Sequence, residues 1–255
     1  MVFQSEKIKM TFKNRFSFRR QGLLGLAPGL IIMVLALCSS SQAFAITVTQ
    51  VVNRTHGLDA ILITIPEKQN IDFSILDVPQ KKDGDSIRSH WNPTNQVLIV
   101  NGGFFNADFT PTGMCKIDEE WINKRPSRGF SGFIAIDKKG RLKVLTRTDN
   151  LNDYPTLMQS GPYVIDPGRK IGIHSRIGRE TRRTLVGKTK AGDLVILITK
   201  PIYLYDLAKA VHETLPTLDR LLNLDGGPST GIIYGTVEEL NTWPVRNYIV
   251  KAKTP

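Results

Sequence analysis

A carboxylate followed by two glycines ends an apolar run in the last quarter of the chain. Leu221–Leu224 leads into Asp225, and Gly226, Gly227 and Ser229 follow. Glycine lets the backbone pass close to a ligand, so an Asp at the end of a buried strand would be rigid yet accessible. Such a carboxylate can act as a general base or a nucleophile. Asp-Gly is also the commonest hairpin turn, in which Asp225 would accept bonds from the amides of Gly227 or Ser229.

A second stretch repeats this design earlier in the chain. The apolar run Val97–Val100 ends at Asn101, and Gly102, Gly103 and Phe104 follow. The two glycines would offer amide donors and room for a ligand. Asn101 could orient a ligand or an attacking water, or it could pair with the backbone at the strand end; the sequence leaves both roles open.

Two further pieces stand in order between these stretches. They are Ser160-Gly161-Pro162 and Arg183-Thr184-Leu185-Val186-Gly187. With these pieces, residues 95 to 235 resemble the phosphodiester glycosidase family, because four ordered motifs match. The resemblance implies a hydrolase that cleaves a sugar 1-phosphodiester, such as an N-acetylglucosamine 1-phosphodiester, at the anomeric carbon. The family usually has a third small residue after Asp-Gly-Gly, where this chain has the stiffer Pro228.

The resemblance also implies roles for particular residues. Asp225 would be the base or nucleophile, and Asn101 would orient a sugar hydroxyl or the attacking water. Arg183 would bind the phosphate, since a planar guanidinium pairs with two phosphate oxygens at once. Contacts to the substrate would come from Gly102, Gly103, Phe104, Gly161, Gly226, Gly227 and Ser229. A phosphomonoester leaves readily, its second pKa being about 6, so one carboxylate could suffice where ordinary glycosidases use two.

Other charged residues have weaker claims. Arg183 lies in a basic segment, residues 169–190, most of which is interpreted as a solvated loop. Asp108 and Glu180 are the candidates for a second carboxylate. No His, Cys, Asp or Glu cluster has the spacing of metal ligands, so no cofactor is predicted; a Mg²⁺ or Ca²⁺ held by Asp225 and the substrate phosphate stays open.

The elements that would position these residues are mostly strands. β-Branched runs between turn residues predict them, and apolar residues at helical spacing predict one longer helix at 203–215, which Pro216 ends. A short helix is expected within 84–91. The predicted strands cover 46–52, 60–65, 71–76, 97–101, 113–117, 130–136, 142–146, 194–199, the run before Asp225, and 248–250. The expected fold is α+β: a single domain with a mixed, largely antiparallel β-sheet and a few packed helices.

The N-terminal residues read as an export signal. Six basic residues and one acid precede an apolar run that closes with Ala43-Phe44-Ala45, the pattern of a cleaved secretory signal. We therefore expect a signal peptide at 1–45, a phosphodiester glycosidase-like domain at 46–255, and a periplasmic or secreted protein without a membrane anchor after cleavage. Cys115 would then be the only cysteine, so no internal disulfide is expected.

The charge balance agrees with a small anionic substrate. Cleavage leaves 28 basic and 22 acidic residues, a net charge of +6, and no nucleic-acid-binding module is visible. The expected partner is a phosphorylated sugar or glycan. A non-catalytic envelope module that binds acidic glycan or assists exopolysaccharide production remains the alternative; the joint presence of Asp225, Asn101 and Arg183 favours an enzyme.

Overall fold

The computed structural model describes residues 45–253. The predicted export signal therefore lies outside the described residues except for Ala45, and the boundary at residue 46 stays a prediction. Among the described residues, no helix is both long and apolar enough to span a bilayer.

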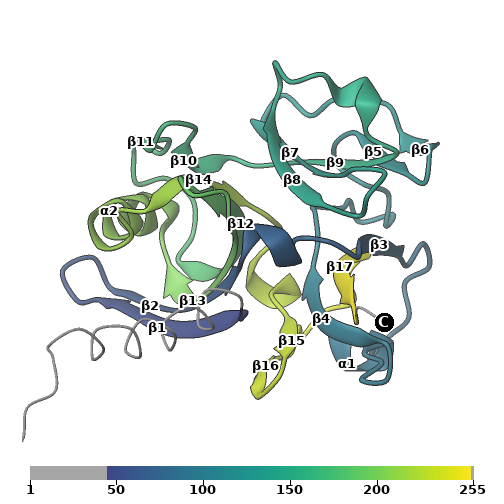
Figure 1. The fold of residues 1–255 in the computed structure, drawn as a ribbon, viewed down its shortest axis with the longest axis horizontal. Coiled ribbons are helices and arrows are strands. Elements are labelled where there is room, and N and C mark those ends of the chain that lie inside the picture. The colour runs from purple at the N-terminus through teal and green to yellow at the C-terminus, as the bar shows by residue number, and fades with distance from the viewer. Residues whose placement is uncertain (1–44, 254–255) are drawn as a thin grey trace, which may run out of the picture. The chain divides into compact units, whose positions relative to one another are not determined.

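The strands of the described chain form three antiparallel sheets (Figure 1). Sheet 1 has seven strands in the order β1-β2-β13-β12-β14-β10-β11. Its strands are β1 (Thr47–Asn53), β2 (Leu58–Ile65), β10 (Tyr163–Asp166), β11 (Lys170–Ile171), β12 (Thr181–Thr189), β13 (Leu194–Ile202) and β14 (Leu218–Asn223). Helix α2 (Leu204–Thr214) packs on this sheet through Leu207, Ala208 and Val211, which share a core with Leu185 and Leu221.

Sheets 2 and 3 have five strands each. Sheet 2, in the order β16-β15-β4-β17-β3, contains β3 (Phe73–Asp77), β4 (Gln96–Asn101), β15 (Ile232–Tyr234), β16 (Val237–Glu239) and β17 (Asn247–Ala252). Sheet 3, in the order β6-β5-β9-β7-β8, contains β5 (Cys115–Ile117), β6 (Glu120–Asn123), β7 (Gly132–Ile136), β8 (Leu142–Thr146) and β9 (Thr156–Ser160). Short helices complete the fold: α1 (Ile87–His90), η2 (Glu67–Gln69), η3 (Leu151–Asp153) and η4 (Gly227–Ser229).

One apolar core joins the three sheets. Val186 and Leu222 of sheet 1, Val100 of sheet 2 and Met158 of sheet 3 belong to the same buried cluster. Alternate residues of sheet 1, such as Leu185, face α2 instead, as the two-residue period of a strand requires. The three sheets therefore pack as one body. The segments that follow β4 and β14 meet inside it.

The expected fold class is right in outline and needs two corrections. The described chain has few helices, as expected, but it is richer in strands than α+β implies, and every described strand pair is antiparallel rather than mixed. The largest single error is β12, a central strand in a segment interpreted mostly as a solvated loop. Basic side chains at both ends of β12 conceal its buried middle, Thr184 to Gly187.

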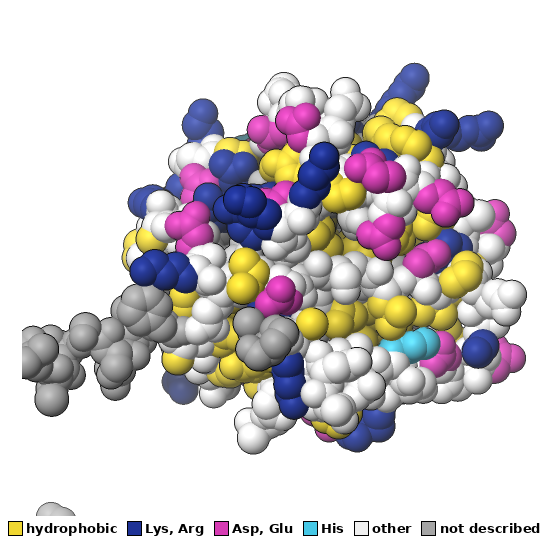
Figure 2. Space-filling model, turned by 45° about the vertical axis from the view of Figure 1, so that its right-hand side comes forward, with side chains coloured by type: hydrophobic (Ala, Val, Ile, Leu, Met, Phe, Trp, Pro, Cys, Tyr) yellow, Lys and Arg dark blue, Asp and Glu magenta, His cyan; other side chains and the backbone are white. Residues whose placement is uncertain are grey.

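Charges of both signs are mixed on the surface. In the view of Figure 2, Lys and Arg side chains are interspersed with Asp and Glu, and apolar side chains show between them. The net positive charge is thus distributed rather than gathered into one basic area on this face. Such a surface gives weak, general attraction for anions, so specific anion binding has to come from particular side chains.

Candidate functional site

Asp225 lies two residues beyond β14, where that strand leaves sheet 1. The amide of Leu224 still donates to the carbonyl of Thr184 on β12, at 2.9 Å. The next amide, of Asp225 itself, donates to the carbonyl of Gly102 at 3.2 Å. Asp225 therefore passes from sheet 1 to the glycine stretch that follows β4, and the two motifs that sequence analysis singled out lie side by side.

The turn after Asp225 needs its glycines. Gly227 has φ +61, a left-handed conformation that other residues adopt at a cost. A Cβ on Gly227 would also stand 2.8 Å from Oγ1 of Thr181, and one on Gly226 would stand 2.8 Å from the carbonyl oxygen of Arg182. Because glycine has no Cβ, the turn can lie directly against the start of β12.

Burial makes Asp225 an unusual carboxylate. Desolvation raises its pKa to about 6, against the lowering effects of hydrogen bonds from the Ser229 side chain and the Gly226 amide. The Gly226 amide donates to Oδ1 at 2.8 Å. Asp225 thus accepts hydrogen bonds within its turn, as the hairpin-turn interpretation predicted. The donors are the Gly226 amide and the Ser229 side chain rather than the amides of Gly227 or Ser229. The same carboxylate has a pKa close to neutral pH, where proton transfer is most effective.

Asn101 is fully buried and joins three segments. Its Nδ2 donates to the carbonyl of Asp225 at 2.8 Å, and its Oδ1 accepts from the Thr184 hydroxyl at 2.7 Å and the Gly231 amide at 3.1 Å. The other Nδ2 hydrogen faces the carbonyl of Gly102 at 3.4 Å. The side chain therefore fixes the main chain of Asp225, which matches the interpretation that Asn101 pairs with backbone.

The amides of Gly102 and Gly103 already have protein partners. Asn247 on β17 accepts both, through its carbonyl from Gly102 at 2.9 Å and through Oδ1 from Gly103 at 2.9 Å. A Cβ on Gly102 would overlap the Asn247 side chain, and one on Gly103 would meet Sδ of Met158. These glycines thus provide room for close packing of sheets 2 and 3, and the described structure uses their amides internally.

The main chain of Arg183 lies beside the turn, whereas its guanidinium forms hydrogen bonds with other segments. Leu185 pairs with Asn223 in the β12–β14 register, and a Cβ on Gly226 would lie 3.7 Å from Cα of Arg183. Its Nε donates to the carbonyl of Ile202 at 3.2 Å, and Nη2 donates to that of Arg179. Burial lowers the pKa of the Arg183 guanidinium.

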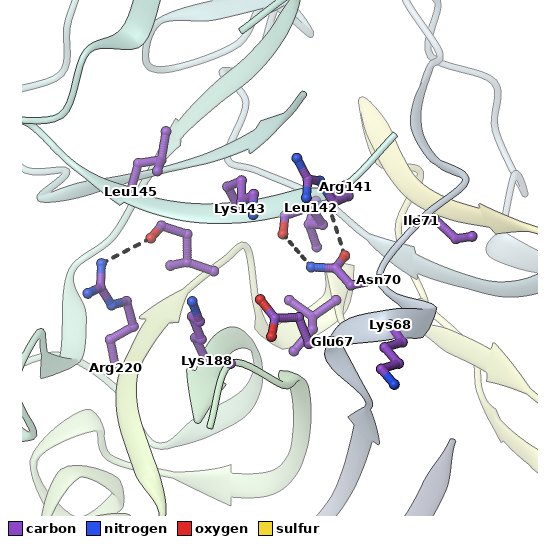
Figure 3. Close-up of a pocket in the computed structure, with 13 residues that line it drawn as sticks. Glu67, Lys68, Asn70, Ile71, Arg141, Leu142, Lys143, Leu145, Lys188 and Arg220 are labelled. Carbon is purple, nitrogen blue, oxygen red and sulfur yellow. Dashed lines mark hydrogen bonds between the residues drawn. The ribbon is translucent and has the colours of Figure 1, made fainter. Parts of the chain in front are cut away.

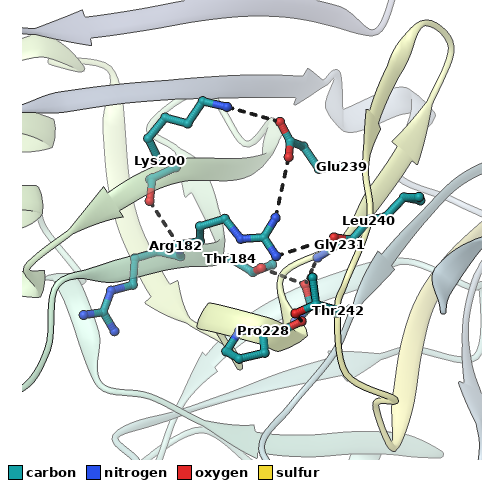
Figure 4. Close-up of polar contacts among 11 residues, drawn as sticks. Arg182, Thr184, Lys200, Pro228, Gly231, Glu239, Leu240 and Thr242 are labelled. Carbon is teal, nitrogen blue, oxygen red and sulfur yellow. Dashed lines mark hydrogen bonds and ion pairs between the residues drawn. The ribbon is translucent and has the colours of Figure 1, made fainter. Parts of the chain in front are cut away.

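The adjacent Arg182 is held differently. It forms an ion pair with Glu239 at 3.6 Å and donates to the carbonyl of Leu240 at 3.4 Å. Figure 4 shows this guanidinium between Glu239 and Leu240, above Pro228 of the turn. Arg182 therefore fastens β16 to β12, which distinguishes it from Arg183.

Gly161 borders the same region through Asn223. The Ser160 hydroxyl donates to the carbonyl of Asn223 at 2.8 Å, the Asn223 amide donates to the carbonyl of Pro162 at 3.0 Å, and Nδ2 of Asn223 faces the carbonyl of Gly161 at 3.4 Å. The third motif is thus joined to the last residue of β14. The main chains of all four motifs therefore meet around Asp225.

Aromatic side chains lie close to both glycine stretches. Phe104 is half-buried and stacks on Phe130, with ring centroids 4.9 Å apart, whereas Phe105 packs into the core of sheet 2. Trp243 is 64% exposed, and its amide donates to the carbonyl of Pro228 at 3.3 Å. Sequence analysis missed Trp243, since no motif contains it.

Three buried polar atoms around this region have no hydrogen-bond partner within residues 45–253. They are Oδ1 of Asn223, Oγ1 of Thr230 and Nδ2 of Asn247. Buried polar atoms normally have partners, so these three atoms have unused hydrogen-bonding capacity beside Asp225. Asn223 stands inside the Asp225 motif and could have been found there; Asn247 lies on a strand with no recognisable signal.

The remaining carboxylates lie outside this arrangement. Asp108 is exposed and bonded to Thr110, and Glu180 is an exposed residue that lines a separate cavity beside Tyr203 and Asp206. In the described part of the chain, no three His, Cys, Asp or Glu side chains gather as metal ligands would. Cys115 is buried, and burial raises its thiol pKa to about 12, so it stays protonated.

The family model for phosphodiester glycosidases matches residues 94–251. No curated protein matches. Solved structures also share the fold. The catalytic domain of zebrafish N-acetylglucosamine-1-phosphodiester alpha-N-acetylglucosaminidase, auto-inhibited by its pro-peptide, has a TM-score of 0.56 at 16% identity, over 82% of this chain and 83% of that one.

The other two structures come from bacteria. A hypothetical protein from Synechocystis has a TM-score of 0.57 at 14% identity, over 80% of this chain and 61% of that one. A protein from Burkholderia pseudomallei, named as a candidate exported protein, has a TM-score of 0.51 at 11% identity, over 76% and 74%. At these identities the likenesses show the fold, and the family follows from the model match: this chain belongs to the phosphodiester glycosidase family.

Proposed function

We propose that this protein is a hydrolase that cleaves a sugar 1-phosphodiester at the anomeric carbon, with Asp225 as the reacting carboxylate. The observation that carries the proposal is the mostly buried Asp225, with a pKa of about 6, at the meeting point of the four sequence motifs, within the residues that the family model matches. With that pKa, roughly nine-tenths of the carboxylates are ionised at pH 7. Asp225 can therefore accept a proton or attack carbon at neutral pH.

The chemistry needs little more than this carboxylate. The bond between the anomeric carbon and the phosphate oxygen breaks, and its electron pair leaves with the phosphomonoester. A water oxygen bonds to the anomeric carbon and gives its proton to Asp225, either directly or after a glycosyl-Asp225 intermediate. Because the departing phosphomonoester is weakly basic, its second pKa being about 6, it leaves without a general acid.

Arg183 is proposed as the phosphate ligand. Two of its five N–H groups are committed to the carbonyls of Ile202 and Arg179, which would hold the guanidinium plane while the others bind phosphate. Asn101 acts through Asp225, whose carbonyl it fixes, and is thus a positioning residue. Phe104 and Trp243 would offer aromatic faces to a sugar ring.

The domain that carries this site is proposed to work outside the cytoplasm. Support comes from the basic and apolar N-terminal pattern that ends at Ala45, and from the likeness to a candidate exported protein. We propose residues 46–255 as the mature domain, acting on phosphorylated sugars or glycans of the envelope. Its β1 begins at Thr47, so cleavage after Ala45 leaves the fold whole.

The test uses N-acetylglucosamine 1-(methyl phosphate) in ¹⁸O-labelled water, with products followed by ³¹P NMR and mass spectrometry. Cleavage at the anomeric carbon places the label in the free sugar, and methyl phosphate stays unlabelled. Label in methyl phosphate would show P–O cleavage and overturn the mechanism. If neither this ester nor other sugar 1-phosphodiesters are cleaved, the non-catalytic glycan-binding alternative replaces the proposal. Asp225→Asn serves as the matched inactive control.

A further inference from the structure

The outermost strand of sheet 1 leaves one side of its backbone unpaired. Strand β1 stands first in the order of sheet 1, and all seven of its residues pair with β2 without a register shift. Within residues 45–253, no side chain and no other main-chain group forms a hydrogen bond with the backbone of Thr47–Asn53 outside this ladder. Alternate amides and carbonyls of β1 therefore point outward without a protein partner, which is the arrangement to which another strand can be added.

The other described sheet edges are shorter, and most of them are charged or irregular. Strand β11 has two residues, and β16 has three, of which Glu238 and Glu239 are acidic. Strand β6 has four residues and a register shift in its pairing with β5. Strand β3 has five residues and ends in Asp77, and the amide of Phe73 at its start donates to the carbonyl of Gly140. Short length, charge and irregular pairing are features that protect an edge from adding a strand.

The remaining edge strand, β8, is covered by side chains. Asn70 donates to the carbonyl of Leu142 at 2.9 Å and accepts from its amide at 3.0 Å. Arg220 donates to the carbonyl of Val144 at 3.2 Å. Figure 3 shows both side chains reaching the backbone of β8 from neighbouring segments. These hydrogen bonds occupy main-chain groups of β8 that a further strand would need.

Strand β1 has none of these protections. Its seven residues include no charged side chain and no proline, and its ladder has no bulge. Val51 is the one buried residue and packs in the core beneath α2. Val48 and Val52 lie on the opposite face of the strand, where they are 46% and 50% exposed. A regular, uncharged edge that displays valines is a favourable site for strand addition.

The residues of β1 complement one another when the strand is reversed around Gln50. Two copies that join edge to edge through a two-fold axis normal to the sheet run antiparallel, and side chains on the same face then oppose each other. With Gln50 opposite its own counterpart, all seven residues are paired, and Val48 opposes Val52 of the second copy. Thr49 then opposes Val51, and such β-branched side chains suit a pleated sheet. The two Gln50 amides can each donate and accept, and the strand brings no like charges into opposition.

We propose that β1 pairs with β1 of a second copy of this chain, antiparallel and centred on Gln50, so that two seven-stranded sheets become one continuous sheet. A second copy is favoured over an unrelated peptide because the valine and amide positions of the strand oppose their own counterparts in this register. Strand β14, which leads to Asp225, is four places from β1 in the sheet, or about 19 Å at the usual spacing of strands. The proposal therefore does not depend on which bond the protein cleaves.

Sedimentation equilibrium of the purified protein, as the expressing bacterium processes it, tests the proposal. Concentrations run from about 1 µM to 1 mM, because an interface below the standard size of about 1,600 Å² is weak. Val48→Lys, Val52→Lys sets like charges against each other in the proposed register, whereas Val48→Lys, Val52→Glu sets opposite charges against each other. The control, Ile122→Lys, Ile177→Lys, changes two exposed apolar residues outside β1 and adds the same charge as the first variant. Thermal melts show that each variant is folded, and hydrogen exchange of residues 47–53 locates the interface.

We expect the wild type, the control and the variant with opposite charges to approach twice the monomer mass as concentration rises, with slower exchange of the β1 amides. The variant with like charges should associate at least tenfold more weakly, because like charges directly opposite each other destabilise a strand pair. The proposal is overturned if the wild type stays monomeric, or if the variant with like charges associates as tightly as the wild type. It is equally overturned if opposite charges fail to retain association, or if a dimer forms without slower exchange in β1.

Discussion

At the scale of single residues, Asp225 is where turn geometry and chemistry coincide. Its side chain accepts the Gly226 amide, and an Asn side chain keeps that acceptor at the same volume. Asp225→Asn removes the ability to take a proton or to attack carbon, so hydrolysis should fall by about 10²–10⁴-fold. The rate of sugar release measures this, and the thermal melt shows whether the variant is folded. Unchanged turnover would remove Asp225 from the mechanism.

The raised pKa of Asp225 predicts how activity depends on pH. A base must be ionised, so the rate should fall as pH decreases through about 6. A rate profile of kcat/KM against pH, measured with N-acetylglucosamine 1-(methyl phosphate), should show this lower limb. If the limb lies near 4, the ordinary range of Asp, the buried carboxylate is not the group that titrates.

The same pKa predicts the opposite trend for stability. Between pH 3.8 and 6 the folded state binds more protons at Asp225 than the unfolded state does. The stabilising effect of the proton is therefore complete below 3.8 and is lost as pH rises through 6, by about 3 kcal/mol in all. Urea unfolding of Asp225→Asn at pH 7.5 should then show a stability equal to or above that of the wild type. A large loss would mean that the carboxylate is needed by the turn.

Arg183 gives a prediction with controls along the same segment. Arg183→Lys keeps the charge but loses the planar guanidinium that donates to the carbonyls of Ile202 and Arg179. We expect kcat/KM for the 1-phosphodiester to fall at least tenfold, because a lost charge-assisted hydrogen bond costs about 1.5–3 kcal/mol. Arg179→Lys, whose carbonyl is retained, should change the rate less than twofold. Equal effects of the two substitutions in steady-state kinetics would mean that the segment acts through its general charge.

At the scale of elements, the packing of sheets depends on small residues beside Asp225. A Cβ at Gly102 would overlap the Asn247 side chain, which also accepts the Gly103 amide. Gly102→Ala should therefore destabilise the fold by about 1–3 kcal/mol, as overpacking does. Gly129→Ala, with open space around the new methyl group, is the matched control. Chemical denaturation of both variants checks this, and equal midpoints would contradict the close packing.

The sequence predicted these elements unevenly, for physical reasons. Strong β-branched runs and the helix at 203–215 are found with boundaries close to those of β2, β13 and α2. β12 was missed because its basic ends resemble a solvated loop, and β9, β10, β15 and β16 because their runs are short. The glycine motifs placed Asp225 at the end of a strand, and β14 does end close by, two residues earlier at Asn223. No local pattern could show that Asn247 holds both amides after Asn101, because that contact links residues 144 positions apart.

At the scale of the whole molecule, the three sheets converge on the four motifs. The first strand, β1, forms the edge of sheet 1 and pairs with β2 from Thr47↔Thr64 to Asn53↔Leu58. The backbone hydrogen bonds between β1 and β2 form only if the residues of β1 remain after cleavage. The position of cleavage therefore affects the stability of the fold as well as export. Cleavage after Ala45 retains the whole ladder.

We therefore predict that the exported protein begins at Ile46. Intact-mass measurement and N-terminal sequencing of protein recovered from a bacterial envelope fraction give the start directly. A chain of residues 46–255 should melt within about 2 °C of the recovered protein, a difference that corresponds to under 1 kcal/mol in a domain of this size. A shorter chain from residue 54 should melt well below both, because β2 keeps only its pairing with β13 and loses the one with β1. Recovery of the chain with Met1 intact, or of a start beyond Thr47, would contradict the predicted cleavage.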